Sequence, residues 1–226
     1  AYAIEGDTLY LMSNGNAFLM PIGGNLKQGL ETMMAYAEEK NIPFTIAAVT
    51  REGEAQLEAC MPGKFTVEYD RDYCDYIYAT QRLQKLAGKK LHSKRNHINK
   101  FNATYELQYE TITDDNLQEV LDMHRAWCKA NDCSDDEDLL EESCAVRDVL
   151  RHLHELPLQG GLIRANGRVV GFSLGQPIND KVFDVCIEKA FYDVNGAYTV
   201  INQQFALHEC EGYEYMNREE DLGIPG

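Results

Sequence analysis

Apolar and polar residues follow one another along the chain in patterns that predict two successive runs of strands and helices. In the first run, alternation within residues 1–12 and 17–22 predicts two strands joined by a turn at 13–16 into a hairpin. Apolar residues at helical spacing after Asn25 predict a helix that ends at 41–43. A strand, a helix and a strand are expected at 44–49, 52–60 and 65–69, so the predicted order is β-β-α-β-α-β.

A second run begins near Ala103 with an alternating strand. Thr113 is expected to cap a helix that reaches Trp127, and the Ser134-x-x-Glu137 capping-box signature predicts a further helix to about residue 156. Strands at 160–165 and 168–174 flank Asn166-Gly167, a strong hairpin signal, and a third strand is expected at 181–188. A helix from 195–196 and a last strand at 213–217 complete the order β-α-α-β-β-β-α-β.

These two runs predict a mixed α/β protein of two domains, at residues 1–102 and 103–226. The order of the second run is typical of GNAT-type N-acyltransferases. The first run resembles a shortened form of the same order of strands and helices. The chain starts inside a strand pattern without an initiator methionine. The first domain is therefore expected to lack its beginning.

Composition narrows the class of protein. With 226 residues, 44% hydrophobic and 26% charged, the chain is long and apolar enough to fold, which excludes disordered and collagenous classes. Since it has no apolar stretch of membrane-spanning length and no secretory signal pattern, we expect a soluble protein. The seven cysteines are scattered and form no CxxC pair, which favours the cytoplasm and argues against a zinc site.

The charge is unevenly distributed. The chain has 21 basic and 37 acidic residues, a net charge of −16, yet residues 81–105 contain no Asp or Glu. A polyanion such as tRNA is therefore expected to bind only at the strip 82–100. Alternatively, these cations neutralise the acidic domain beside them. The basic residues of this strip are Arg82, Lys85, Lys89, Lys90, Lys94, Arg95 and Lys100.

Three stretches carry a resemblance to a known family: residues 88–101 (GKKLHSKRNHINKF), residues 187–190 (IEKA) together with 196–202 (GAYTVIN), and residues 217–223 (NREEDLG). Together they resemble the C-terminal domain of bacterial phosphatidylglycerol lysyltransferases, and more closely the soluble stand-alone proteins that carry this domain. The resemblance implies two tandem GNAT-like domains. It also implies that the second domain lacks its end, because relatives continue with a basic segment after the position of Gly226.

The family resemblance also implies a chemistry. Membrane-embedded members transfer an aminoacyl group from charged tRNA to a lipid. The corresponding expectation is transfer of an acyl or aminoacyl group from aminoacyl-tRNA or acyl-CoA to an amine or hydroxyl, on a small molecule or a lipid headgroup. Two alternatives stay open: a noncatalytic module that binds tRNA or another anion, and a conventional acetyl-CoA-dependent N-acetyltransferase.

The helix expected from Asn195-Gly196 is a candidate donor site. The first N–H groups of a helix have no partner within the helix, and its dipole favours a phosphate there. The candidates for donor binding are Gly196, Ala197, Tyr198 and Asn202. An acetyl-CoA-binding loop usually has several glycines, whereas only Gly196 is present here. An ordinary helix with an Asn cap explains the pattern equally well.

Glu188 and Lys189 end the strand that precedes this helix, where open α/β sheets bind ligands. Acylation of an amine needs a base, and Glu188 is the candidate catalytic residue. Lys189 is expected to bind an anionic group or to neutralise Glu188, although strand neighbours face opposite sides unless a bulge intervenes. The alternative is a structural ion pair with residues 217–221.

Charged groups at two further places complete the candidates for substrate and donor binding. At the end of the last strand, Glu219 or Asp221 is expected to attract an α-ammonium and Arg218 a carboxylate or phosphate. Lys94 is expected to face an anion, whereas for Arg95 and Asn96 a buried structural role between the domains is favoured. The histidines have no metal-ligand spacing, so no metal is expected. The candidates at the end of the last strand are Asn217, Arg218, Glu219 and Asp221. The candidates in the basic strip are Lys94, Arg95 and Asn96.

Overall fold

The computed structural model describes residues 1–13 and 16–220. The chain forms two compact units, Ala1–Tyr73 and Cys74–Gly226. Each unit has its own buried cluster of apolar side chains. The division between the units lies 29 residues before the boundary expected from the sequence, because residues 74–102 pack with the second unit.

The first unit contains a two-stranded sheet and two helices. Strands β1 (Tyr2–Glu5) and β2 (Thr8–Leu11) pair antiparallel, and helices α1 (Leu26–Lys40) and α2 (Arg51–Cys60) follow. Asn25 caps α1, since its Oδ1 accepts from Gln28 N at 3.1 Å, as the sequence predicted. Phe18 packs against Met33 and Ala37 of α1 to form the centre of this unit.

Strand predictions in the first unit are partly wrong. The hairpin of β1 and β2 closes at Gly6, with φ of +56°. The expected pairing across 13–16 is present only as isolated antiparallel bridges, Met12 with Phe18 and Leu9 with Ile22, and residues 14 and 15 lie outside the described residues. Residues 17–22 and 44–49 form only isolated bridges, and 65–69 form no strand. Alternation indicates which face of a segment is apolar, but a strand also needs a neighbouring edge to pair with, and Pro21 and Pro43 have no N–H to donate.

The second unit is built on a six-stranded sheet with the order β3-β8-β7-β6-β5-β4. Only β7 and β8 are parallel among these pairs; the others are antiparallel. From residue 103 onward the element order is β-α-α-β-β-β-α-β, as predicted. The strands are β3 (Asp75–Ala79), β4 (Leu107–Thr111), β5 (Gln159–Ala165), β6 (Arg168–Pro177), β7 (Val182–Ala190) and β8 (Tyr215–Glu220).

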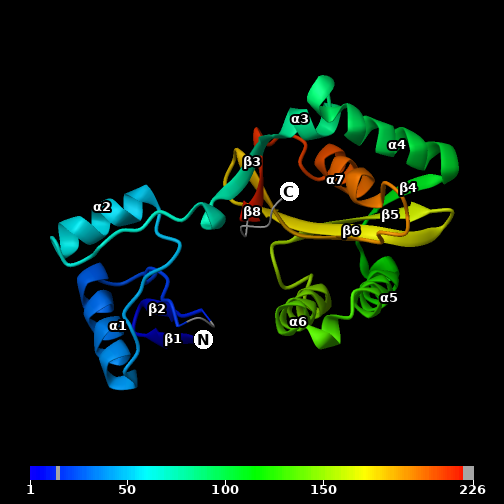
Figure 1. Cartoon of the computed structure of the whole chain (residues 1–226). Coiled ribbons are helices and arrows are strands. Elements are labelled where there is room, and N and C mark those ends of the chain that lie inside the picture. Colours follow the sequence, from blue (N-terminus) through cyan, green and yellow to red (C-terminus); the bar gives the residue numbers. More distant parts are fainter. Residues whose placement is uncertain (14–15, 221–226) are drawn as a thin grey trace. The chain divides into compact units, whose positions relative to one another are not determined.

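Helices cover both faces of this sheet (Figure 1). On one face lie α3 (Thr80–Lys85), α4 (His92–Thr104) and α7 (Ala197–His208); on the other lie α5 (Asp114–Ala130) and α6 (Glu137–Arg151). Short 3₁₀ turns occur at Arg71–Tyr73, Lys89–Leu91 and Cys133–Asp135. The completely buried side chains include Phe101, Leu162, Phe172, Val200, Ile201 and Phe205.

Two local findings refine the sequence prediction. Thr113 caps α5, and Thr113 N donates to Asn116 Oδ1 at 2.8 Å in a capping box, so that prediction is confirmed. The predicted cap at Ser134 is wrong, because Asp136 caps α6 and accepts from Leu139 N at 3.0 Å. Strand β3 was not predicted; it pairs with the outer edge of β8, which explains why residues 74–102 belong to the second unit.

Candidate functional site

The parallel strands β7 and β8 pair only over their first residues. Partners are Val182 with Tyr215, Phe183 with Met216 and Asp184 with Asn217. The pairing stops there, while β7 continues to Ala190 and β8 continues to Glu220, paired on its other edge with β3. Glu188 and Arg218 both lie past the last paired residues. The strands therefore diverge at their carboxyl ends, where α/β sheets commonly bind ligands.

Three of the predicted site residues meet at this divergence. Arg218 Nη2 donates to Glu188 Oε1 at 2.9 Å, and Asn202 Nδ2 donates to Glu188 Oε2 at 3.2 Å. The Glu188 side chain is 10% exposed and that of Arg218 is 31% exposed. The contact with Arg218 is the ion pair with residues 217–221 that the sequence gave as an alternative. We refer to Glu188, Asn202 and Arg218 as the Glu188 cluster.

A β-bulge directs Glu188 toward α7. Leu174 and Gln176 of β6 pair with Ile187 and Asp184 of β7, so β7 has one extra residue between these two pairs. Before the bulge, Phe183 packs against Phe205 of α7. Because the extra residue reverses the alternation, Glu188 faces α7 as well, and its neighbour Lys189 faces the other helical layer.

Lys189 is held on that other face. Its Nζ donates to Glu142 Oε1 of α6 at 2.6 Å and lies 4.3 Å from the centre of the Trp127 ring of α5. The residue is buried. The expectation that Lys189 neutralises Glu188 is therefore wrong, because the two side chains contact different helical layers. No spacing rule in the sequence linked Lys189 to Glu142, which lies 47 residues away.

The other polar residues described at the end of β8 have different hydrogen-bond partners from Arg218. Asn217 Nδ2 donates to Asp75 Oδ2 of β3 at 2.7 Å, and Glu219 N donates to Asn217 Oδ1 at 3.0 Å. Burial, followed by the charges of Asp184, Glu220 and Asp75, raises the pKa of Glu219 to about 7. Burial, with Asp75 and Glu220, also raises the pKa of Asp184. Asp221 lies outside the described residues.

The raised pKa of Glu219 predicts a pH-dependent stability. The folded state holds this proton more tightly than the unfolded chain, so the contribution of Glu219 to the free energy of unfolding is complete below pH about 4.5. It declines until pH about 7 and is constant above. Glu219→Gln does not titrate, so we expect it to be more stable than the wild type by about 1 kcal/mol at pH 8, after solvent screening, and equal to it at pH 4.

Urea unfolding at the two pH values measures this difference. The exposed Glu211→Gln is the matched control, since it removes one carboxylate at the surface. Parallel pH profiles for wild type and Glu219→Gln would contradict the assigned pKa.

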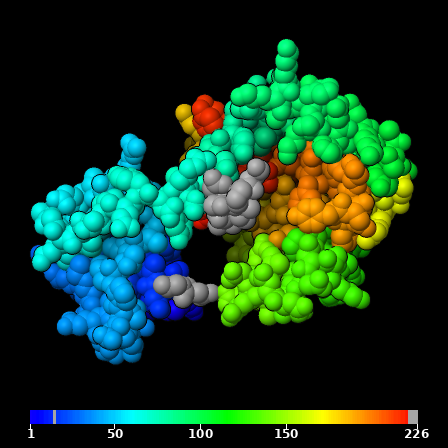
Figure 2. Space-filling view, viewed as in Figure 1, coloured from blue at the N-terminus to red at the C-terminus, as the bar shows by residue number. Residues whose placement is uncertain are grey.

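The beginning of α7 lies against the backbone of α4. Gly196, with φ of +89°, precedes the first turn of α7, and a methyl group there would lie 2.8 Å from the His97 carbonyl oxygen. Any other residue would therefore force α4 away. Figure 2 shows the surface of α4 (green) beside that of α7 (orange), in agreement with the packing of the two helices.

A pocket opens at this end of α7, and we call it the α7 pocket. It has a volume of about 300 Å³. The predicted donor residues Gly196, Ala197 and Tyr198 are among its walls, whereas Asn202 contacts Glu188 instead. Tyr198 Oη accepts from Trp127 Nε1 at 3.1 Å, and burial raises the pKa of Tyr198 to about 12. The walls are formed by His97, Phe191, Tyr192, Val194, Gly196, Ala197, Tyr198 and Thr199.

The basic strip is divided between structural and exposed cations. Arg95 Nη1 donates to the carbonyls of Leu86 and, at 2.8 Å, Gly88, so it holds the turn before α4 and not an interface between domains. Asn96 is exposed and contacts His92 Nε2 at 3.2 Å, so its predicted burial is wrong. The exposed cations are Arg82, Lys85, Lys89, Lys90, Lys94 and Lys100.

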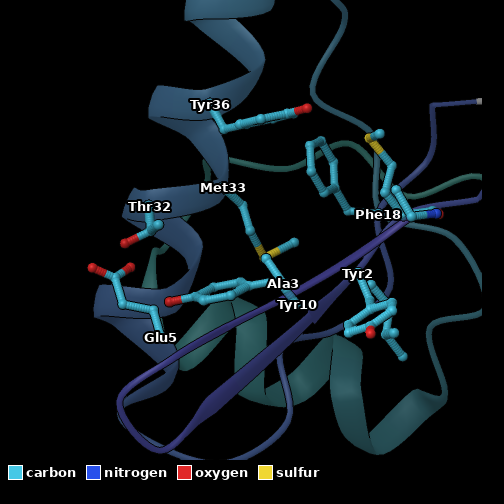
Figure 3. A pocket seen from close by; sticks show the side chains of 11 residues that line it. Tyr2, Ala3, Glu5, Tyr10, Phe18, Thr32, Met33 and Tyr36 are labelled. Carbon is cyan, nitrogen blue, oxygen red and sulfur yellow. The ribbon is translucent and has the colours of Figure 1, made fainter.

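A second pocket, of about 190 Å³, lies in the first unit (Figure 3). It is lined mainly by aromatic and methionine side chains of the hairpin and α1, such as Tyr10, Phe18, Met33 and Tyr36. None of the residues that the sequence singled out lines it. The candidate chemistry is thus concentrated in the second unit.

The described residues contain neither a cluster of metal ligands nor a membrane-spanning helix. Over residues 1–13 and 16–220, no three His, Cys, Asp or Glu side chains are grouped to hold a metal ion. Within the same ranges no helix combines the length and the apolarity needed to cross a bilayer.

Comparison with known proteins identifies relatives over the whole chain. The family model described as "Phosphatidylglycerol lysyltransferase, C-terminal" matches residues 2–226. A conserved protein of unknown function from Bacteroides thetaiotaomicron has a solved structure that is 41% identical, with a TM-score of 0.84. The match covers 100% of this chain and 78% of that one.

Two more distant relatives are one solved structure with the same fold and one curated sequence. The C-terminal domain of a candidate lysylphosphatidylglycerol synthetase from Agrobacterium fabrum is 12% identical with a TM-score of 0.59, covering 94% of this chain and 70% of that one. An uncharacterized protein from Mycoplasmoides gallisepticum is 22% identical over 152 residues, 66% of this chain. The match spans about half, 48%, of that curated relative's length.

Proposed function

Because the chain belongs to the family of phosphatidylglycerol lysyltransferase C-terminal domains, we propose that it is an acyltransferase-like protein. It transfers an acyl or aminoacyl group from a phosphate-bearing donor, an aminoacyl-tRNA or an acyl-CoA, to an amine or hydroxyl acceptor. The observation that carries the proposal is the Glu188 cluster at the divergence of β7 and β8. The tandem GNAT-like organisation inferred from the resemblance is part of the same proposal.

Glu188 is the proposed general base. An acceptor ammonium must lose a proton before its nitrogen can attack the donor carbonyl carbon, and Glu188 accepts that proton. The C–N bond forms as the carbonyl becomes a tetrahedral oxyanion. When this intermediate collapses, the C–O bond to the ribose of tRNA or the C–S bond to CoA breaks, the leaving oxygen or sulfur takes the proton that Glu188 accepted, and the nitrogen releases its second proton to solvent. Asn202 and Arg218 hold the carboxylate, and their remaining N–H groups are the proposed donors to the developing oxyanion.

The donor is proposed to lie on the α4 and α7 side of the sheet. The α7 pocket is at the helix N-terminus, where the dipole stabilises an anion by about 0.3–1 kcal/mol when exposed. Helix α4 contributes His97 to this pocket, and Lys94, which is exposed, lies one turn earlier on α4. The phosphates and the acyl carbonyl of the donor then contact neighbouring residues of α4, α7 and β7.

A noncatalytic module that binds an anion is the second candidate. It is favoured by the engagement of both Glu188 oxygens, one by Arg218 and one by Asn202, which leaves the carboxylate in a structural ion pair. In that case the exposed lysines of the strip bind a polyanion and no group is transferred.

Incubation with two acyl-labelled donors, aminoacyl-tRNA and acyl-CoA, each with an excess of a primary amine, tests the proposal, and uncharged tRNA serves as the binding control. We expect the acyl label to leave the aminoacyl-tRNA or the acyl-CoA and to appear as an amide, at a rate proportional to protein concentration. Salt-sensitive binding of both tRNAs without release of the label would support the module instead and overturn the transferase.

A further inference from the structure

The α7 pocket has the features of a site for a nucleobase. Tyr192, in the turn between β7 and α7, is 74% exposed although it lines the pocket. Its ring lies 4.9 Å from that of Tyr198, at 40°. Phe191 and His97 also line the pocket, but the Phe191 ring is buried and the guanidinium carbon of Arg168 lies 4.6 Å from its centre. Because Tyr198 is only partly exposed, Tyr192 is the more accessible of the two tyrosines for stacking.

Helix α4, which contributes His97 to the pocket, carries two lysines within one turn of that residue. Lys94 and Lys100 are exposed and stand three residues before and after His97, on neighbouring turns. None of the residues that line the pocket carries a carboxylate. Aromatic faces beside flexible cations are the combination by which proteins hold single nucleotides: the base stacks and the phosphates contact lysine. The volume, about 300 Å³, is at the lower end of the range for small-molecule sites.

We propose that the α7 pocket binds the nucleoside end of a nucleotide, with its base stacked on the ring of Tyr192 and its phosphates directed to Lys94 of α4. The proposal rests on the proposed function, in which the donor carries phosphates, and adds that the donor is recognised by its base. The end of an RNA and a free nucleotide share this chemistry.

Fluorescence of Trp127, the only tryptophan of the chain, provides the readout, because its indole N–H bonds to the Tyr198 hydroxyl in the pocket wall. The intact chain is titrated with a single-stranded RNA trinucleotide ending in adenosine, with adenosine 3′,5′-bisphosphate and with inorganic pyrophosphate. The variants are Tyr192→Ala and Tyr192→Phe. Tyr73→Ala, an exposed tyrosine of the first unit, is the matched control.

We expect Tyr192→Ala to weaken binding of both base-containing probes about tenfold and to leave pyrophosphate within twofold of the wild type. Tyr192→Phe and Tyr73→Ala should bind all probes as the wild type does. Tighter binding of the trinucleotide than of the bisphosphate assigns the site to an RNA end, and the reverse order assigns it to a free nucleotide. Thermal unfolding of each variant shows whether the fold is retained.

Unchanged affinity of Tyr192→Ala for both base-containing probes, an equal loss for pyrophosphate, or no binding of these probes by the wild type would overturn the inference. Failure of the inference differs from failure of the proposed function. The first appears as acyl transfer that persists with no effect of Tyr192 on binding. The second appears as absence of transfer from any donor, whatever the effect of Tyr192→Ala.

Discussion

Glu188→Gln is expected to lower the rate of acyl transfer by a factor of about 10²–10⁴, the usual contribution of a general base. The amide has nearly the shape of the carboxylate: its oxygen can still accept from Arg218, and its NH2 group can donate to Oδ1 of Asn202 once that amide turns over, so the cluster should keep its geometry. It cannot take a proton from the attacking ammonium. Donor affinity should change less than threefold, and the loss should be in kcat.

Single-turnover assays at saturating donor measure this effect. The control is Glu110→Gln on β4, because Glu110 is also paired with an arginine, Arg164, at 2.7 Å, but on a different part of the sheet. We expect Glu110→Gln to transfer within twofold of the wild type. Equal rates for wild type and Glu188→Gln would leave Glu188 as a structural ion pair and remove it from the chemistry.

Replacing Lys89, Lys90 and Lys94 together by Gln is expected to weaken binding of tRNA by about tenfold to hundredfold at 50 mM salt. Each lysine that contacts a phosphate releases a counterion on binding, so the slope of log K against log salt should become shallower by about two. The three side chains are exposed, which leaves the fold intact. Filter binding at several salt concentrations provides both the affinity and the slope.

A variant with the same change of net charge separates local contact from the field of the whole protein. Lys27, Lys40 and Lys64 lie in the first unit, and their replacement by Gln also removes three positive charges. We expect this control to retain the wild-type salt slope. If both triple variants lose the same affinity, the strip is not a binding surface and its cations only reduce the repulsion of a chain with net charge −16.

The fold of the second unit was largely predictable because its signals are local and mutually consistent. Asn166-Gly167 gives the hairpin of β5 and β6, and Thr113 gives the start of α5. The first unit was less predictable, since residues 17–22 and 44–49 have strand-like alternation but form only isolated bridges. Strand β3 was missed because its pairing with β8 joins residues about 140 positions apart, and no local pattern encodes such a pairing.

The candidate site was predictable as a set of residues but not as an arrangement. Sequence reasoning named Glu188, Asn202 and Arg218 separately, and the structure brings these three together. The sequence did not show which of Glu188 and Lys189 points toward α7. The face on which each side chain lies depends on one extra residue in β7, and only the register with β6 reveals that residue. Of the residues that line the α7 pocket, Tyr192 had no motif to mark it, and His97 lies in the family-like stretch 88–101 but was not named as a site residue.

Hydrogen–deuterium exchange of the intact chain, with and without a saturating phosphate-bearing donor, shows where the donor binds. We expect slower exchange in the first turn of α7 and in α4, with residues around Glu188 on β7 also protected, and unchanged exchange in α5, α6 and the first unit. Protection confined to α5 and α6, or to the aromatic pocket of the first unit, would contradict the placement of the donor and with it the proposed transferase site.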